Sequence, residues 1–148
     1  MKINELIKKP IQVIVENNIS EDMIFPDTLK REVIDKITLK LQNIQNFLLV
    51  YVNNKEGKLI KAVITSSELS ALITLINQNM GSETIEDLQL ETSFPMKYDV
   101  EVSEPIDTAL TMFANQKTDV VVVRSSDNEY LGKVTRTKLK DWFKIMDN

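Results

Sequence analysis

The sequence contains no cysteine and no histidine. Without cysteine there is no disulfide framework, no thiolate nucleophile and no cysteine-based zinc site. Without histidine the chain lacks the side chain that titrates near neutral pH, which is also the commonest transition-metal ligand. These absences exclude serine–histidine hydrolysis, cysteine–histidine catalysis and histidine-ligated zinc. Carboxylates, Lys, Tyr, Ser, Thr or an oxygen-ligated Mg²⁺ would have to support any catalysis, and we expect a protein that is not an enzyme.

Long apolar runs are also missing. The longest, residues 47–52 and 120–123, have the length of a strand, whereas about 20 apolar residues are needed to cross a bilayer. Residues 1–5 lack the apolar stretch of a secretory signal. We therefore expect no membrane span and a cytoplasmic location. With 148 residues, of which 43% are apolar and 27% charged, the composition fits one ordinary globular domain or two very small ones.

The net charge of −4 is unevenly distributed. Residues 83–107 hold eight acidic side chains and a single basic one, Lys97. The rest of the chain has a small basic excess, well below that of a general nucleic-acid binder. We therefore expect no nucleic-acid partner, and we interpret the acidic segment as a solvated linker and strand face.

An internal repeat organises the chain. At a sequence offset of 70, region 48–76 aligns without a gap with region 118–146, each reading as a strand, a polar turn, a strand and an amphipathic helix. Apolar residues at positions i, i+3, i+4 and i+7 of the helix coincide in the two copies. They are Leu69, Leu72, Ile73 and Ile76 in the first copy and Leu139, Trp142, Phe143 and Met146 in the second. The hydroxyls expected to cap these helices are those of Ser66, Ser67, Thr135 and Thr137.

The offset is larger in the upstream part of each copy. It is 76 for an expected helix and 77 for an expected first strand, where Met23 and Phe25 align with Val100 and Val102. Each copy thus predicts strand, helix, strand, strand, helix, with a short insertion in the first copy near 38–46. The predicted organisation is a lead-in segment at 1–19, repeat 1 at 20–77, a linker at 78–93 and repeat 2 at 94–148.

Each copy is too small for a robust core of its own, so the two must bury each other's apolar faces. We predict an α+β fold of two βαββα repeats packed as a pseudo-two-fold pair with clefts between the repeats.

Three segments resemble the motifs of the tandem CBS (cystathionine-β-synthase) domain pair, also called a Bateman module. The family's last strand and helix usually read apolar-Gly-apolar-apolar-Ser/Thr-x-x-Asp-apolar. Residues 131–139 (LGKVTRTKL) and 60–69 (IKAVITSSEL) are similar to that pattern. Residues 100–110 (VEVSEPIDTAL) are similar to the family's first strand and helix. The resemblance covers about residues 20–147.

The resemblance implies a regulatory module that binds an adenosine-type ligand in the clefts and signals to an unidentified protein effector, as a homodimer and without a required cofactor. AMP, ADP, ATP, S-adenosylmethionine and cyclic di-AMP are the ligands to consider. In the family, the Ser/Thr and Asp of the motif hold ribose hydroxyls and phosphate, and the first strand encloses the base. The implied first site consists of Thr65 and Glu68, with Ile24, Phe25 and Pro26 near the base. The implied second site consists of Thr135 and Arg136, with Glu101, Val102 and Ser103 near the base.

The chain departs from the family pattern at three positions. The motif Asp is Glu68 in the first copy, which can still accept hydrogen bonds from a ribose diol. It is Lys138 in the second copy, which cannot accept any; Lys138 would instead favour a phosphate or extend into solvent. The motif Gly is Ala62 in the first copy. These departures leave an alternative open, a ligand-independent dimerisation or protein-interaction module with degenerate sites.

Overall fold

The structure is a computed structural model that describes residues 2–79, 83–116 and 118–147. Residues 1, 80–82, 117 and 148, which belong to the predicted lead-in, linker and second repeat, lie outside the described residues. The chain divides into two compact units, Ser20–Lys97 on the one hand and Met1–Ile19 with Tyr98–Asn148 on the other. The lead-in thus belongs to the unit of the second repeat, and the described part of the linker to the unit of the first.

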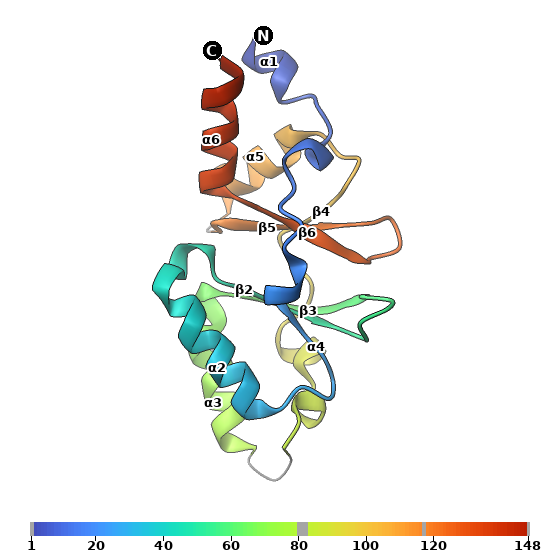
Figure 1. Cartoon of the computed structure of the whole chain (residues 1–148), viewed down its shortest axis with the longest axis vertical. Helices are drawn as coiled ribbons and strands as arrows, with labels where there is room; N and C mark the ends of the chain where they lie inside the picture. Colours follow the sequence, from blue (N-terminus) through green and yellow to red (C-terminus); the bar gives the residue numbers. More distant parts are fainter. Residues whose placement is uncertain (1, 80–82, 117, 148) are drawn as a thin grey trace. The chain divides into compact units, whose positions relative to one another are not determined.

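The two units contain corresponding elements (Figure 1). Unit 20–97 has β1 (Met23–Ile24), α2 (Lys30–Lys40), η3 (Leu41–Asn46), β2 (Leu48–Val52), β3 (Ile60–Thr65), η4 (Ser66–Glu68), α3 (Leu69–Gln78), η5 (Ile85–Leu88) and α4 (Leu90–Ser93), with η2 (Ile19–Glu21) at its start. The other unit has α1 (Ile3–Leu6), η1 (Ile11–Ile14), β4 (Asp99–Glu101), α5 (Ile106–Asn115), β5 (Val120–Arg124), β6 (Tyr130–Thr135) and α6 (Arg136–Asp147).

Among the described residues the strands form two three-stranded sheets, with the orders β1-β2-β3 and β4-β5-β6. In each sheet the first strand runs parallel to the second, and the third runs antiparallel to it. A parallel pair needs a crossover connection, which α2 and α5 provide. The α+β prediction and the predicted order of elements in each repeat are confirmed.

The strand register corrects the repeat alignment. Leu48 pairs with Thr65, and Val120 pairs with Thr135. The last strands therefore keep the predicted offset of 70, whereas β5 follows β2 at an offset of 72. The insertion in the first copy is consequently split between its hairpin turn and the region of η3 before β2. Ile24 matches Val100 in register, so the offset of the first strands is 76 rather than 77.

Each unit has its own hydrophobic core. In unit 20–97 the core joins one face of the sheet to α2 and α3, which lie side by side in Figure 1. Its buried side chains include Ile24, Leu49 and Ile64 from the strands and Val33, Ile37, Leu72 and Ile76 from the helices. The corresponding core of the other unit contains Val100, Val121, Val134, Ala109, Phe113 and Leu139. The helical stripe of the first repeat thus lies against its core, as its spacing predicts; in the second stripe Leu139, Trp142 and Phe143 do so, and Met146 does not belong to that core.

A segment from outside the repeat pairs with the last strand of each sheet. Glu16 of the lead-in exchanges two backbone hydrogen bonds with Lys133 in β6, at 2.8 and 3.2 Å. In unit 20–97, the amide of Val63 in β3 donates to the carbonyl of Phe94 at 3.1 Å. Glu16 of the lead-in and Phe94, which follows the predicted linker, therefore have equivalent positions in their units.

Candidate functional site

The junction between β3 and α3, residues 65–68 (the first junction), holds the polar pair implied for the first site. The backbone N–H of Thr65 donates to Glu68 Oε1 at 3.0 Å, and the Thr65 hydroxyl donates to the same oxygen at 3.1 Å. Thr65 in turn caps the helical turn with its side chain, which completes a capping box. The cap is therefore Thr65 and not Ser66 or Ser67, because the helical turn starts directly after the strand.

Lys97, which the sequence analysis did not assign to a site, joins the first junction. Its ammonium forms an ion pair with Glu68 Oε2 and donates to the carbonyl of Val63 at 2.8 Å. The side chains of Lys97 and Glu68 are 25% and 21% exposed, so both remain accessible to a ligand. The signal that could have pointed to Lys97 is its position as the single base among the acids of 83–107.

The equivalent junction between β6 and α6, residues 135–138 (the second junction), has a different set of contacts. Thr135 Oγ accepts a hydrogen bond from the N–H of Lys138 at 3.0 Å and acts as the helix cap. Arg136 Nε donates to Asp119 at 3.1 Å, and its Nη2 donates to the carbonyls of Phe113 and Thr118 at 2.9 and 3.1 Å. The Lys138 side chain is exposed. This junction therefore carries positive charge, and its guanidinium already binds the loop that precedes β5.

The residues expected near the base lie at different depths. Ile24 is fully buried in the core of its unit, while Phe25 and Pro26 are half-buried. Val102 is half-buried and Ser103 is exposed, and the Ser103 hydroxyl donates to Glu101 at 2.7 Å. Because Leu48 at the start of β2 pairs with Thr65 and Ile24 pairs with Tyr51 near its end, the sheet does not bring Phe25 and Pro26 to the first junction.

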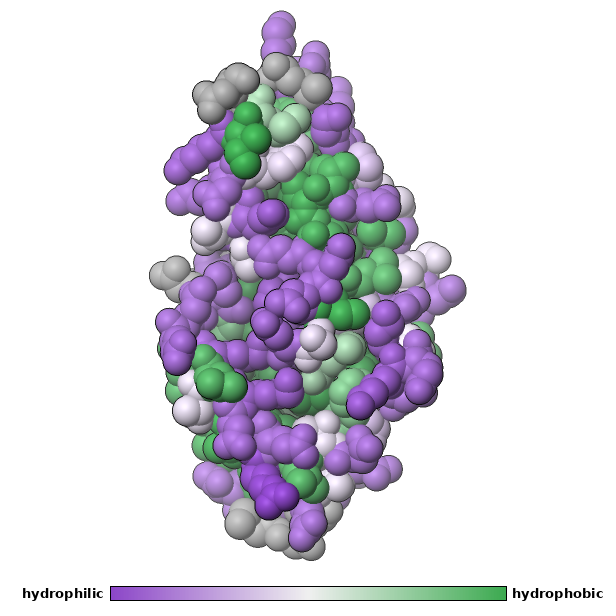
Figure 2. All heavy atoms as spheres, in the orientation of Figure 1, coloured by the Kyte–Doolittle hydropathy of each residue, from purple (hydrophilic) through white to green (hydrophobic). Residues whose placement is uncertain are grey.

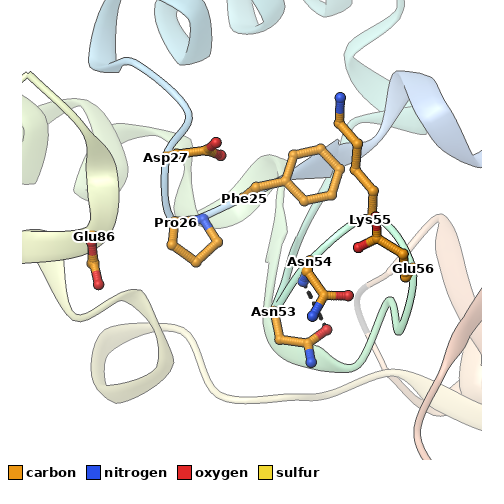
Figure 3. A pocket seen from close by; sticks show the side chains of 8 residues that line it. All are labelled: Phe25, Pro26, Asp27, Asn53, Asn54, Lys55, Glu56 and Glu86. Atoms are coloured by element: carbon orange, nitrogen blue, oxygen red, sulfur yellow. Dashed lines mark hydrogen bonds between the residues drawn. The ribbon is translucent and has the colours of Figure 1, made fainter.

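Phe25 and Pro26 instead line a cavity of about 390 Å³ beside the β2–β3 hairpin (Figure 3). Hairpin residues 53–56 form one side of it, and Asp27 and Glu86 add carboxylates. The Lys55 ammonium lies 5.9 Å from the centre of the Phe25 ring. The cavity therefore lies at the end of the sheet where β2 finishes, whereas the first junction lies at the opposite end, where β2 begins.

The described residues hold no group of three or more acidic side chains arranged to bind a metal ion. None of the helices described is both long and apolar enough to span a bilayer. Hydrophilic side chains cover much of the face seen in Figure 2, with apolar side chains between them. At the first junction, Thr65, Glu68 and Lys97 offer a ligand hydrogen bonds and ion pairs.

Comparisons with known proteins bear on the fold. No protein-family model matches the sequence, and no curated protein matches it significantly. Many solved structures are similar, and the four described below are 14–17% identical to this chain. One is CBSX2 in complex with AMP, which is 17% identical and aligns over 95% of this chain and 99% of its own, with a TM-score of 0.68. A structure of CBSX2 from Arabidopsis thaliana is 14% identical over 95% and 98% of the two chains, with a TM-score of 0.65.

Two further structures extend the similarity. The CBS domains of a transcriptional regulator from Streptococcus pneumoniae are 16% identical, over 89% of this chain and 97% of theirs, with a TM-score of 0.61. The CBS domain pair of protein MJ0100, in complex with 5′-methylthioadenosine and S-adenosyl-L-methionine, is 17% identical over 93% and 98% of the two chains, with a TM-score of 0.60. With two βαββα repeats and these structural neighbours, the chain has the fold of a tandem CBS-domain pair.

Proposed function

We propose that this chain is a non-enzymatic regulatory module that binds an adenine nucleotide or a related adenosyl ligand and signals to a partner protein. The fold supports this proposal, because structural neighbours with the same fold hold AMP, or 5′-methylthioadenosine and S-adenosyl-L-methionine. For such binding to regulate anything, the ligand must favour one arrangement of the chain over another.

The observation that carries the proposal is the arrangement at the first junction. A carboxylate has about four lone-pair positions, and Glu68 uses three of them for the N–H and hydroxyl of Thr65 and for Lys97. One position is left to accept from a ribose hydroxyl. We propose Thr65 and Glu68 as the ribose-binding pair, and Phe25 and Pro26 as base contacts only if the ligand extends along the sheet to them.

The second junction is the weaker candidate. Lys138 offers donors only, so a ribose diol placed against it would find no acceptor. Three of the five N–H donors of Arg136 have partners in Asp119 and two carbonyls. We propose Thr135, Arg136, Lys138, Val102 and Ser103 as a second, phosphate-selective site, which a thermal shift that remains when Thr65 and Glu68 are substituted would support.

Ligand-induced thermal stabilisation tests the proposal. The protein is heated with AMP, ADP, ATP, S-adenosylmethionine or cyclic di-AMP, and with GTP as a control. A ligand at about 100 times its Kd stabilises by about 2.7 kcal/mol, which raises Tm by about 5–10 °C for a chain of this size. We expect the double variant Thr65→Ala/Glu68→Gln to lose that shift relative to its own ligand-free Tm.

A matched control separates the site from general destabilisation. Thr38→Ala/Glu32→Gln makes the same chemical changes on the exposed surface of α2 and should keep the full shift. A full shift in Thr65→Ala/Glu68→Gln would show that this pair does not bind the ligand.

The alternative function, a ligand-independent interaction module, is favoured by two observations. Lys138 replaces the motif acid, and Leu39, Leu41 and Ile44 are exposed around the end of α2 and in η3. A folded wild-type protein that no adenosyl ligand stabilises would support this alternative. Sedimentation of the wild type would then decide whether the chain forms the expected homodimer.

A further inference from the structure

Lys97 is the last residue of unit 20–97 and lies two positions before β4 (Asp99–Glu101) of the other unit. Its ammonium carries three hydrogens. Within the described residues, one of them binds the carbonyl of Val63 and another the carboxylate of Glu68. The third hydrogen is available, and the side chain is a quarter exposed. A ligand at the first junction can therefore contact both Glu68 and the ammonium.

The pair sets the charge that a ligand meets. Glu68 alone would present a negative site, which attracts a cationic group and repels a phosphate. With Lys97 in contact, the junction has no net charge and adds a donor. Hydrogen bonds from a charged donor to an anionic oxygen are about twice as strong as neutral ones. The junction with both residues therefore favours a ligand that carries an anion close to its ribose.

The geometry fits such a ligand. Thr65 occupies Oε1 of Glu68 twice, so a hydroxyl would be held by Oε2 at about 2.7 Å, and Lys97 contacts that same oxygen. The hydroxyl and the ammonium are then at most two hydrogen-bond lengths apart, about 6 Å. A ribose with a 5′ substituent covers that distance, so the group that Lys97 meets is the substituent of the sugar rather than the base.

The other repeat lacks this pair. The backbone bonds of Phe94 with Val63 and of Glu16 with Lys133 are equivalent, so that Lys97 corresponds to Ile19 and Glu68 to Lys138. One repeat therefore has an acid and a base in contact, and the other has a base and an apolar residue at these positions. The second junction has a different ion pair, in which Arg136 contacts Asp119 from the loop before β5, so the two junctions present different charged groups to a ligand.

We infer that Lys97 is a specificity-determining residue of the first junction, which selects adenosine ligands with a 5′-phosphate over those with an uncharged or sulfonium 5′ group. The inference rests on the proposed function of that junction. Lys97 acts here as a hydrogen-bond donor to the phosphate. Its positive charge also offsets that of Glu68, so that the junction does not favour a cationic ligand.

Isothermal titration calorimetry with AMP, adenosine and S-adenosylmethionine tests this inference on the full chain. In Lys97→Met the ratio of AMP affinity to adenosine affinity should fall about tenfold, as expected for loss of a charge-assisted hydrogen bond, and S-adenosylmethionine should bind more tightly. Salt should weaken AMP binding to the wild type and have less effect on the variant. Lys97→Arg should restore most of the preference for AMP.

Lys61→Met, an exposed lysine on β3, is the matched control and should leave all three affinities unchanged. If wild type and Lys97→Met bind AMP and adenosine in the same ratio, the inference about Lys97 is wrong while the proposed function stands. If the folded wild type binds none of the three compounds, the inference is wrong, and if ADP, ATP and cyclic di-AMP also fail to stabilise it, the proposed function is wrong as well. A purely structural role for Lys97 would lower all affinities together and leave their ratios unchanged, which also contradicts the inference.

Discussion

Substitution of Gly132 in β6 tests whether the lead-in segment packs against that strand. The glycine has φ of 155°, and a Cβ added to it would lie 2.4 Å from the carbonyl oxygen of Glu16 and 2.5 Å from Val15 Cγ1. Carbon atoms in contact are about 3.5 Å or more from their neighbours. The Gly132→Ala variant therefore cannot form without moving the lead-in backbone away from the sheet.

The cost of that movement comes from broken hydrogen bonds and backbone strain. Separation of the strands breaks the two hydrogen bonds between Glu16 and Lys133, at about 1 kcal/mol each. A β-carbon at this φ adds about 1 kcal/mol or more of backbone strain. We expect Gly132→Ala to lose about 3 kcal/mol of unfolding free energy, which corresponds to about 6–12 °C in Tm.

Circular dichroism during heating measures the change in Tm, and amide hydrogen exchange locates it. The amides of Glu16 and Lys133 should lose protection in Gly132→Ala. The control is Gly57→Ala in the β2–β3 turn, where the nearest atom to the new Cβ is Asn54 Oδ1 at 3.2 Å, and where we expect a change within about 1 kcal/mol. A Gly132→Ala protein with unchanged Tm and a protected Glu16 amide would refute the reasoning.

Two further substitutions test other parts of the structure. Arg136→Lys keeps the charge but loses the guanidinium N–H groups that bind the carbonyls of Phe113 and Thr118. The free energy of unfolding, measured with urea, should fall by about 1–2 kcal/mol. Lys140→Ala on the same helix is the control and should leave it unchanged. Burial and neighbouring carboxylates raise the pKa of Tyr51 above 10.0, so the unfolded state releases the phenol proton first and stability must fall as pH rises beyond about 10. Tyr51→Phe should flatten that alkaline decline in a series of melting curves, and an equally steep decline would contradict the assignment to Tyr51.

The order of elements could be predicted because apolar periodicity is a local property of the sequence. The helical stripe at Leu72 and Ile76 and the strand at 48–52 follow from spacings of about 3.6 and from β-rich composition. Duplication then made the prediction stronger, since two copies had to agree. Neither signal depends on contacts between distant parts of the chain.

The strand register could not be predicted in the same way. The run of four valines at 120–123 fits its partner strand equally well after a shift of two positions, because such a shift keeps the same side chains on the same face. Pairing with β6 decides between the alternatives, and it places Val120 opposite Thr135. The extra hairpin residues of the first copy are polar, so they left no periodic signal that would reveal the gap.

Contacts between charged residues that are far apart in the sequence could not be predicted either. Glu68 and Lys97 are separated by α3 and by the turn and helix of 85–93, and only the path of that segment back along β3, fixed by the bond of Val63 with Phe94, brings them together. The motif glycine illustrates the same point. In the second copy the lead-in backbone lies so close to Gly132 that it leaves no room for a side chain there. The motif alone does not predict this contact.

The two junctions also show why a motif hydroxyl by itself is a poor predictor of a ligand site. Thr65 and Thr135 cap their helices in the same way, so both would be retained by folding requirements alone. The charged groups around them differ. Glu68 contacts Lys97 at the first junction, whereas the second has Lys138 and an Arg136 that is bound to Asp119. If an adenosyl ligand binds this chain, substitutions at Glu68 and Lys97 should therefore change its affinity more than substitution of the threonine that both repeats share.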